Sequence, residues 1–296
     1  MSAYCEKLKK AGIEYRLNEP SAAHVTMKAG GALSIFVLPK NVSELIFAFN
    51  EAKKENIKPF ILGNGSNTVF SDNGFNGAVI GTELICNIMV TEEKIEADCG
   101  AILSKVASLA ADNSLAGMEF AHGIPGSLGG AVFMNAGAYG GEMKDIIESV
   151  TFFDGEKITV KNANELFFDY RESEFSKNGA IVLSVKLKLQ KGKKTEIKAK
   201  MKELLKKRKE KQPLNYPSSG STFKRPEGYF AGKLIEDAGL KGKRIGNMAV
   251  SEKHAGFVVN LGGGTETDLE KLISEVQETV REKFKVELEP EIRIIK

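Results

Sequence analysis

Two glycine-rich segments constrain the fold of this chain more than any other feature. Gly63-Asn64-Gly65-Ser66-Asn67 directly follows the apolar run Phe60–Leu62, and a longer stretch extends from His122 to Gly140. Glycine lets the backbone turn tightly and approach a ligand closely, and exposed N–H groups in such turns bind phosphates. The shorter segment alone is equally compatible with an anion site and with a tight turn between strands. The longer segment alone is also compatible with close packing of a helix over a sheet. Two together favour a ligand of dinucleotide size.

The shorter segment does not match the common nucleotide-binding motifs. Thr68 stands where the third glycine of GxGxxG belongs, and GxxxxGK[ST] is absent. No helical pattern opens directly after Asn67, as either motif would require. The shorter segment therefore fits neither a Rossmann fingerprint nor a P-loop. In the longer segment, a helix beginning near Ser127 would direct N–H groups towards an anion.

The hydrophobic periodicity predicts an α+β chain. Alternation and short apolar runs predict strands at 34–38, 60–62, 68–70, 78–80, 85–90, 94–98, 150–153, 157–160, 180–189, 257–260 and 292–295. Apolar positions at helical spacing predict helices at 102–111, 195–212, 232–238 and 267–284, the last with Thr267 as N-cap, and one opened by Ser43. Asp154-Gly155, between two of the strands, predicts a hairpin. We expect a first domain over residues 1–193, with subdomains of about 1–84 and 85–193, and a second over 194–296.

The formal charge of +3 hides a strong asymmetry. Residues 186–211 hold 13 Lys or Arg against three Glu, so the rest of the chain is acidic. Ile197, Met201, Leu204 and Leu205 share one face of the helix predicted there, which favours a docked face and a solvated basic face over a nucleic-acid surface. We therefore expect no nucleic-acid partner.

The remaining composition favours a cytoplasmic protein without a metal site. No apolar run approaches the roughly 20 residues that span a membrane, and the N-terminal residues lack the apolar core of a signal peptide. Cys5, Cys86 and Cys99 form no CxxC pair. The histidines are far apart in the chain, at His24, His122 and His254. We expect no metal site and no membrane or obligatory protein partner.

Three polar segments are candidates for chemistry. An arginine at Arg171 could grip a carboxylate with two hydrogen bonds, although a structural arginine is the commoner case. The hydroxyl cluster at 218–222, followed by Lys224 and Arg225, suits an anionic substrate or a polar surface loop. Glu291 stands at the predicted start of the last strand, where an exposed carboxylate is the usual finding.

The order and spacing of these motifs resemble the UDP-N-acetylenolpyruvoylglucosamine reductases over nearly the whole chain. The matching segments are HVTMKAGG (24–31), LGNGSN (62–67), HGIPGSLGGAVFMNAGAYG (122–140), YRES (170–173), SSGSTFKRP (218–226), AGKLIEDAGLKGKRIGNMAVSEKHAGFVVN (231–260) and LEPEIRII (288–295). The resemblance implies an FAD-binding domain of the vanillyl-alcohol-oxidase/PCMH type, built from two α+β subdomains, and a C-terminal α+β substrate domain. It also implies non-covalent FAD and NADPH as reductant.

The resemblance also assigns the site residues. The catalytic residues would be Arg171, Ser221 as proton donor, and Glu291. The FAD-binding residues would be Gly63, Asn64, Gly65, Ser66, Asn67, His122, Gly123, Ile124, Pro125, Gly126, Ser127, Gly129, Gly130, Ala131 and Ala138. The substrate-binding residues would be Tyr170, Lys224, Asn247 and His254. The short distance from Arg171 to the strand at 180–189 indicates the shorter class of the family, which lacks an extra tyrosine-bearing loop.

The implied reaction reduces the enolpyruvyl C=C of a UDP-sugar in peptidoglycan precursor synthesis, yielding UDP-N-acetylmuramate. Arg171 would bind the substrate carboxylate, Glu291 would hydrogen-bond it in protonated form or through water, and Ser221 would deliver the proton. The nearest alternative is another flavoprotein oxidase or dehydrogenase of the same fold. The motifs at 220–224 and 288–292 weigh against it.

Overall fold

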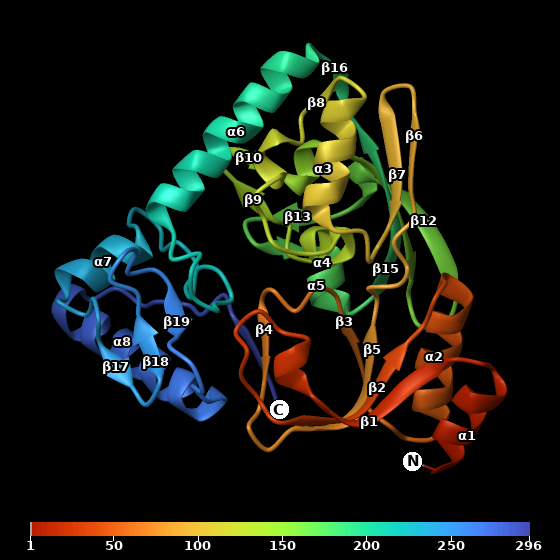
Figure 1. Ribbon diagram of the computed structural model, residues 1–296, viewed down its shortest axis with the longest axis horizontal. Helices are drawn as coiled ribbons and strands as arrows, with labels where there is room; N and C mark the ends of the chain where they lie inside the picture. The colour runs from red at the N-terminus through yellow and green to blue at the C-terminus, as the bar shows by residue number, and fades with distance from the viewer. Residues whose placement is uncertain (1) are drawn as a thin grey trace. The chain divides into compact units, whose positions relative to one another are not determined.

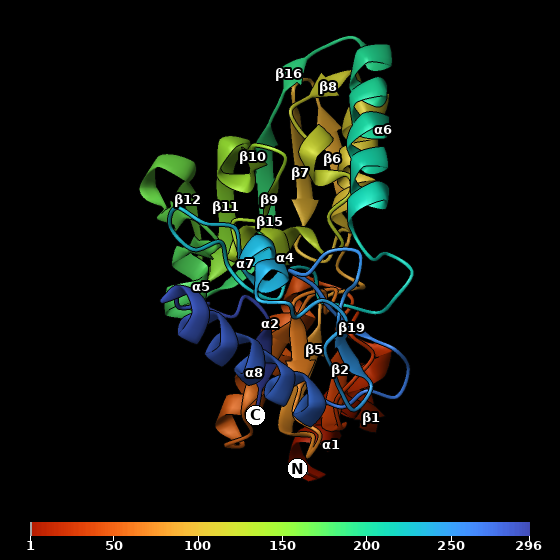
Figure 2. The ribbon, with the colours of Figure 1, turned by 90° about the vertical axis from the view of Figure 1, so that its left-hand side faces the viewer.

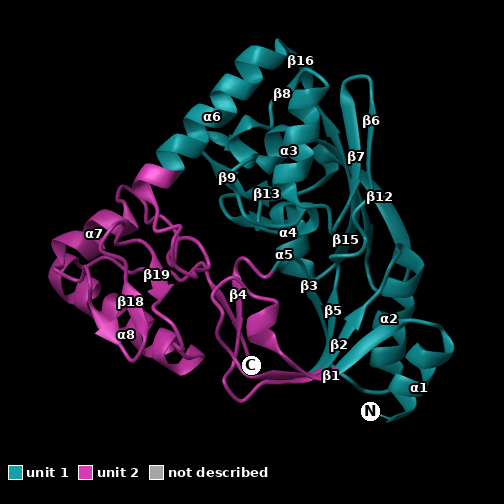
Figure 3. Ribbon diagram, viewed as in Figure 1, with its two compact units in different colours: residues 1–16, 35–64, 77–208 teal, residues 17–34, 65–76, 209–296 magenta. Residues whose placement is uncertain are grey.

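The computed structural model describes residues 2–296 and divides into two compact units. The first unit comprises residues 1–16, 35–64 and 77–208, and the second comprises 17–34, 65–76 and 209–296 (Figures 1 and 3). Two N-terminal segments thus belong with the C-terminal part of the chain. The expected domain division at residue 193 stays a prediction.

A four-stranded sheet carries the N-terminal part of the fold in the order β1-β2-β5-β3. Its strands are β1 (Glu14–Pro20), β2 (Ala32–Leu38), β3 (Pro59–Leu62) and β5 (Phe75–Gly81). β3 and β5 are parallel, with Phe60 opposite Val79. The accompanying helices are α1 (Ser2–Lys10) and α2 (Val42–Lys54), with η1 (Ser21–Ala23) after β1. Asn41, and not the expected Ser43, is the N-cap of α2, because its side chain accepts the Glu44 N–H.

The second sheet of the first unit is antiparallel and has the order β12-β11-β15-β7-β6. Its strands are β6 (Ile88–Thr91), β7 (Lys94–Asp98), β11 (Ile147–Phe153), β12 (Ile158–Asn162) and β15 (Ile181–Lys188). Residues 154–157 close the predicted hairpin between β11 and β12, where Asp154 accepts the N–H groups of Glu156 and Lys157. β15 lies at the centre of this sheet, which explains its mostly buried side chains.

The first unit also contains further elements, of which α4 (Leu128–Phe133) and β9 (Gly137–Ala138) lie in the second glycine-rich segment. The others are α3 (Leu103–Asp112), β8 (Leu115–Ala116), η2 (Glu119–Ala121), β10 (Gly141–Glu142), η3 (Met143–Asp145), η4 (Ala163–Glu165), β13 (Phe168–Asp169), β14 (Glu172–Ser173), α5 (Glu174–Asn178) and β16 (Gln190–Lys191).

The basic segment forms α6 (Lys194–Lys211), which runs alongside α3 (Figures 1 and 2). Ile197 and Met201 are buried in the core of the first unit, while Lys194 and Lys198 pair with Asp112 at the end of α3. The predicted division into a docked face and a solvated basic face is confirmed. Leu205 is only half-buried, so it contributes less to the docked face than expected.

The second unit builds its core from a three-stranded sheet and two helices. The sheet has the order β17-β18-β19, with β17 (Arg244–Ile245), β18 (Met248–Val250) and β19 (Val258–Asn260), and the helices are α7 (Ala231–Asp237) and α8 (Glu266–Phe284). The N-cap of α8 is Thr265, not the expected Thr267, because Thr265 and Asp268 form a reciprocal capping box. Leu269, Leu272 and Val276 of α8 are fully buried in this core.

The last strand of the chain, β20 (Arg293–Ile295), pairs with β4 (Thr68–Phe70) in the second unit. The two strands run parallel, with Ile294 opposite Val69. β4 directly follows the Gly63–Asn67 loop, so this pairing holds the end of that loop beside the residues that precede β20. In residues 2–296, no helix is both long and apolar enough to cross a membrane.

Candidate active site

The Gly63–Asn67 loop connects β3 to β4 and presents backbone donors. Gly65 adopts φ +60°, and a Cβ atom there would overlap the His24 carbonyl oxygen. Its own carbonyl accepts the N–H of Thr26 at 3.0 Å. Within residues 2–296, the N–H groups of Asn64, Gly65 and Ser66 meet no protein acceptor. A turn with free N–H groups and a glycine that admits close backbone approach suits the diphosphate of a dinucleotide.

The second glycine-rich segment contains a comparable set of donors around the start of α4. Ser127 is the N-cap of α4, with Oγ 3.4 Å from the Gly130 N–H. A Cβ atom on Gly63 would overlap this same Ser127 hydroxyl, so the two glycine-rich segments meet within the first unit. Gly123, Gly126 and Ser127 have N–H groups with no protein acceptor within residues 2–296. The residues present therefore fit the FAD that the family motifs imply.

Some glycines of this segment serve packing rather than ligand binding. The Gly129 N–H donates to the Cys99 carbonyl at 2.8 Å, and a Cβ atom there would lie 2.8 Å from Cys99 Cβ. Gly129 thus lets α4 pack closely against residue 99. His122 lies at the edge of the segment, with Nδ1 3.5 Å from Ser108 Oγ.

Arg208, which the sequence analysis did not single out, lies in the last turn of α6 beside the second glycine-rich segment. Its side chain is partly buried, and a Cβ atom on Gly123 would lie 3.1 Å from Arg208 Cδ. Burial lowers the pKa of the Arg208 guanidinium from its ordinary value. The last turn of α6 therefore brings a partly desolvated cation against the glycine-rich segment.

Arg171 lies at the tip of the β13–β14 hairpin in an unusual backbone conformation. Its φ is +56°, a left-handed value that costs a non-glycine residue about 1–2 kcal/mol. The guanidinium Nη2 donates to the Gly137 carbonyl at 3.0 Å, and Cζ lies 5.0 Å from the centre of the exposed Tyr170 ring. Strained residues of this kind cluster at functional sites, which supports a role for Arg171 beyond packing.

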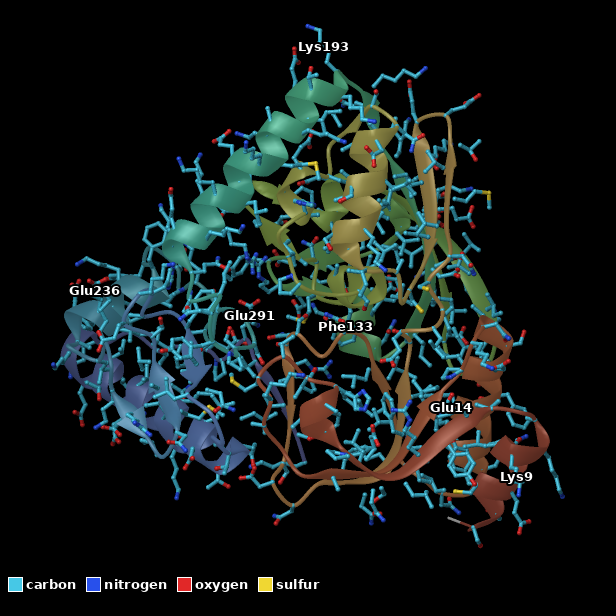
Figure 4. All side chains as sticks on the ribbon, viewed as in Figure 1. Lys9, Glu14, Phe133, Lys193, Glu236 and Glu291 are labelled. Atoms are coloured by element: carbon cyan, nitrogen blue, oxygen red, sulfur yellow. The ribbon has the colours of Figure 1, made fainter. Side chains whose placement is uncertain are left out.

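Ser221 and Glu291 are brought together by backbone pairing in the second unit. The Glu291 N–H donates to the Thr222 carbonyl, and the Lys224 N–H donates to the Glu289 carbonyl, both at 2.8 Å. Glu291 is half-buried just before β20, whose observed start is Arg293 and not Glu291 as expected (Figure 4). Ser221, next to Thr222, is exposed. The loop that follows α6 and the C-terminal segment therefore form one two-stranded platform.

The Gly63–Asn67 loop is tied to this platform. Asn67 Nδ2 donates to the Glu291 carbonyl at 2.9 Å, and the Arg293 N–H donates to the Asn67 carbonyl at 3.0 Å. One residue of the predicted cofactor loop thus fixes the backbone of a predicted catalytic residue.

Three of the predicted substrate-binding residues, Lys224, Asn247 and His254, belong to the second unit, and each contacts different neighbours. Lys224 pairs with Glu289 at 2.6 Å, and Asn247 accepts a hydrogen bond from Arg244. His254 Nδ1 accepts the Gly256 N–H at 3.1 Å, and burial lowers the pKa of its imidazole. Among residues 2–296, no group of three or more His, Cys, Asp or Glu side chains is placed to hold a metal.

Two residues that the sequence did not single out support the site. Thr222 is fully buried, and its Oγ1 accepts the Val258 N–H at 2.9 Å while its backbone pairs with Glu291. Asn135, within the second glycine-rich segment, is fully buried and donates to the Asp169 carbonyl of the Arg171 hairpin. Its place in the NAGAYG motif is the only sequence signal that could have marked it.

Comparison with known proteins agrees with this arrangement. Residues 212–295 match the model of the UDP-N-acetylenolpyruvoylglucosamine reductase C-terminal domain, and residues 33–161 match that of an FAD binding domain. The UDP-N-acetylenolpyruvoylglucosamine reductase of Caldanaerobacter subterraneus is 50% identical over 94% of this chain and 93% of its own length. The one from Clostridium perfringens is 46% identical over 100% of this chain and 99% of its own. This chain belongs to the UDP-N-acetylenolpyruvoylglucosamine reductase family.

A solved structure supports the same assignment. The crystal structure of the UDP-N-acetylenolpyruvylglucosamine reductase (MurB) from Thermus caldophilus superimposes with a TM-score of 0.79 at 35% identity, covering 96% of this chain and 99% of that one. The predicted α+β fold with a vanillyl-alcohol-oxidase/PCMH-type FAD domain is confirmed. The chain is a UDP-N-acetylmuramate dehydrogenase, an oxidoreductase of peptidoglycan precursor synthesis that uses FAD and NADPH. The alternative of another flavoprotein oxidase is thereby set aside.

Proposed function

We propose that Arg171, Glu291 and Ser221 carry out the reduction of the enolpyruvyl C=C in UDP-N-acetylglucosamine enolpyruvate. FAD, once reduced by NADPH, supplies the hydride, which goes to the methylene carbon of the substrate. The chain's own residues then stabilise the negative charge on the neighbouring carbon and its carboxylate, and they deliver a proton to that carbon. The observation that carries the proposal is the backbone platform that joins the Ser221 loop to Glu291.

Arg171 binds the substrate carboxylate in this proposal. One guanidinium nitrogen donates to Gly137, and a planar guanidinium carries enough N–H donors to bind a carboxylate as well. As the double bond is reduced, charge moves into that carboxylate, so a cation held there lowers the barrier. The left-handed backbone at Arg171 supports this role, because such strain persists only where surrounding contacts enforce it.

Glu291 hydrogen-bonds the same developing charge in its protonated form or through a bridging water. A carboxylate anion beside a growing negative charge would raise the barrier, whereas a neutral carboxylic acid donates a hydrogen bond to it. The half-buried position of Glu291 and its fixed backbone, paired on both sides with Thr222 and Asn67, support the assignment.

Ser221 donates the proton to the carbon that bears the carboxylate. A hydroxyl is a weak acid, but a carbanion-like centre is basic enough to take its proton, and solvent then returns one to the serine. Gly220, with φ +78°, turns the loop next to Ser221, and the exposed hydroxyl is accessible to a ligand. Tyr170, Lys224, Asn247 and His254 bind other parts of the substrate.

The cofactor contacts follow from the glycine-rich loops. Residues 63–67 would hold the diphosphate of FAD through backbone N–H groups, and residues from His122 to Ala131, together with Ala138, would hold the rest of the cofactor. The short segment from Arg171 to β15, which holds only β14 and α5, supports the shorter class of the family. We expect the enzyme to act in the cytoplasm on a small-molecule substrate, without nucleic acid, membrane or obligatory protein partner.

Ser221→Ala in the purified holoenzyme tests this proposal. NADPH should bleach the flavin at the wild-type rate, whereas reoxidation by the enolpyruvyl substrate should slow about 10²–10⁴-fold, as for loss of a proton donor. Glu291→Ala should show the same division between half-reactions, because alanine cannot donate a hydrogen bond to the developing charge. Ser218→Ala, which removes a hydroxyl from the same loop, is the matched control. Equal slowing of both half-reactions in Ser221→Ala, or an unchanged reoxidation rate, would reject the proton-donor role.

A further inference from the structure

Asn135 occupies a fully buried position just beyond α4. Its side chain is 0% exposed, and its backbone is left-handed with φ +40°. Asparagine tolerates this conformation better than most residues, yet burying a primary amide is costly unless its polar atoms are hydrogen-bonded. The contacts of Asn135 therefore indicate what the position requires.

The Asn135 amide uses both its nitrogen and its oxygen. Nδ2 donates to the Asp169 carbonyl at 2.9 Å and to Glu142 Oε2 at 3.0 Å. Oδ1 accepts the Lys144 N–H at 3.0 Å. These bonds use both amide hydrogens and one lone pair of the oxygen. No other common side chain offers two donors and an acceptor in so small a volume.

The residue joins two segments that carry the proposed carboxylate site. Segment 133–137 contacts segment 169–173 at three alternate positions. Ser173 Oγ donates to the Phe133 carbonyl at 2.7 Å, and Arg171 donates to the Gly137 carbonyl at 3.0 Å (Figure 4 labels Phe133). The middle link is the Asn135 side chain, and it holds the carbonyl of Asp169, two residues before Arg171.

We propose that Asn135 is a positioning residue that holds Arg171 in its left-handed turn and so aims the guanidinium at the substrate carboxylate. This inference rests on the proposed role of Arg171. The left-handed conformation of Arg171 is disfavoured for any residue with a side chain, so contacts on the hairpin must enforce it. Without the Asn135 donor, the Asp169 carbonyl loses its buried partner and the hairpin tip is free to relax. Asn135 itself contacts neither substrate nor cofactor in this proposal.

Two variants, Asn135→Gly and Asn135→Asp, distinguish the contribution of the side-chain amide from that of the left-handed backbone at this position. Glycine accepts the left-handed φ but provides no donor, and aspartate keeps the shape while placing a second carboxylate beside Glu142. We expect FAD content and reduction by NADPH to stay at wild-type levels in both. Reoxidation by the enolpyruvyl substrate should slow about 10- to 100-fold, with weaker substrate binding. Asn113→Asp, which removes an exposed amide bonded to the Leu109 carbonyl, should change neither half-reaction.

A double-mutant cycle with Arg171→Lys shows whether Asn135 acts through Arg171. Lysine cannot form the two parallel hydrogen bonds that a guanidinium makes to a carboxylate, so in Arg171→Lys the orientation of residue 171 should matter little. Asn135→Gly should then slow reoxidation by less than about threefold in the Arg171→Lys background. A full 10- to 100-fold effect there, or equal slowing of both half-reactions in the single variants, would reject the inference.

The same experiment keeps this inference distinct from the proposed function. If Arg171→Lys leaves reoxidation at the wild-type rate, the carboxylate role of Arg171 fails, and the positioning role fails with it. If Arg171→Lys slows reoxidation while both Asn135 variants behave as wild type, only the positioning role fails. Where Asn135→Gly loosens the segment enough to lose FAD, the isosteric Asn135→Asp gives the decisive rates.

Discussion

The side-chain amide of Asn67 donates a hydrogen bond to the backbone carbonyl of Glu291, with 2.9 Å between Nδ2 and O. Asn67 ends the loop proposed to bind the FAD diphosphate, and Glu291 is the residue proposed to hydrogen-bond the developing negative charge of the substrate. Cofactor loop and catalytic segment are therefore ordered by the same contact. A substitution in the Gly63–Asn67 loop should therefore have a measurable effect on the reaction step that uses Glu291.

Replacing Asn67 with alanine should slow the substrate half-reaction and weaken FAD binding together. A lost side-chain hydrogen bond to a partly buried carbonyl costs about 1 kcal/mol, which corresponds to roughly a fivefold change in rate or affinity. Stopped-flow reoxidation and flavin dissociation measure the two effects. Asn87→Ala, which removes an exposed bond to Asp98, is the control. If Asn67→Ala changed the reoxidation rate and FAD binding no more than Asn87→Ala does, the coupling between the loop and Glu291 would be contradicted.

Gly65→Ala should abolish stable FAD binding. The residue has φ +60°, and an added Cβ atom would overlap the His24 carbonyl, so the loop must shift by more than a side-chain adjustment. The flavin absorbance per protein after gel filtration provides the measurement. Gly12→Ala is the matched control, since Gly12 has φ +72° but nothing within 4 Å of the added atom. Stoichiometric FAD retained in the Gly65→Ala variant would show that the loop does not approach the cofactor.

Asp72→Asn should destabilise the second unit in a pH-dependent manner. The Asp72 carboxylate accepts the N–H groups of Glu266 at 2.8 Å and Thr267 at 2.9 Å, at the start of α8. Burial alone would raise the pKa of Asp72, but hydrogen bonds from Thr267, Glu266 and Thr265 outweigh it and hold the pKa below its ordinary value. The stabilisation is thus fully present above the ordinary aspartate pKa of about 4, and it is lost as pH falls through the lower folded-state value.

Urea unfolding with saturating FAD tests this expectation. Asp72→Asn should lower the unfolding free energy by about 1–2 kcal/mol at pH 7, the range for loss of a helix cap, and by less at about pH 3. Asp112→Asn removes an equal charge that pairs with the exposed Lys194 and Lys198, so its effect should be smaller. If Asp72→Asn lowered the unfolding free energy equally at pH 7 and at about pH 3, the ionised Asp72 carboxylate would not be what stabilises the start of α8.

One cysteine should react quickly with thiol reagents in the native protein. Cys86 is exposed, whereas Cys99 is buried, and burial followed by the nearby Asp98 raises the pKa of its thiol to about 12. Burial also raises the pKa of the partly buried Cys5. Ellman titration at about pH 8 should therefore find one fast thiol, absent in Cys86→Ser, and three after denaturation. A fast thiol that persists in Cys86→Ser would show that a second cysteine becomes accessible.

Local patterns predicted the elements well and their long-range partners poorly. The expected limits of β4 (Thr68–Phe70) and β7 (Lys94–Asp98) agree with the structure, because each is a short run bounded by polar turns. The N-caps of α2 and α8 were wrong, since Ser43 and Thr267 are good capping types but Asn41 and Thr265 make the bonds. Which hydroxyl or amide caps a helix depends on the angle at which the chain enters it.

The site shows the same limit. The motifs marked Arg171, Ser221 and Glu291, but the geometry that orders them comes from residues 36 to 224 positions away in the chain, such as Asn135 for Arg171 and Asn67 for Glu291. Side-chain hydrogen bonds over such separations leave no periodic trace in a sequence. Arg208 likewise reads as one more charge of a basic helix until the packing of α6 places it beside Gly123.

The parallel pairing of β20 with β4 has a consequence for how the enzyme is made. Asn67 leaves the ribosome 224 residues before its partner Glu291. At about 5–20 residues per second, the cofactor loop waits roughly 10–45 s for the strand that orders it. During translation the nascent chain therefore exposes a loop that cannot yet hold FAD tightly, and flavin loading is expected to follow chain completion.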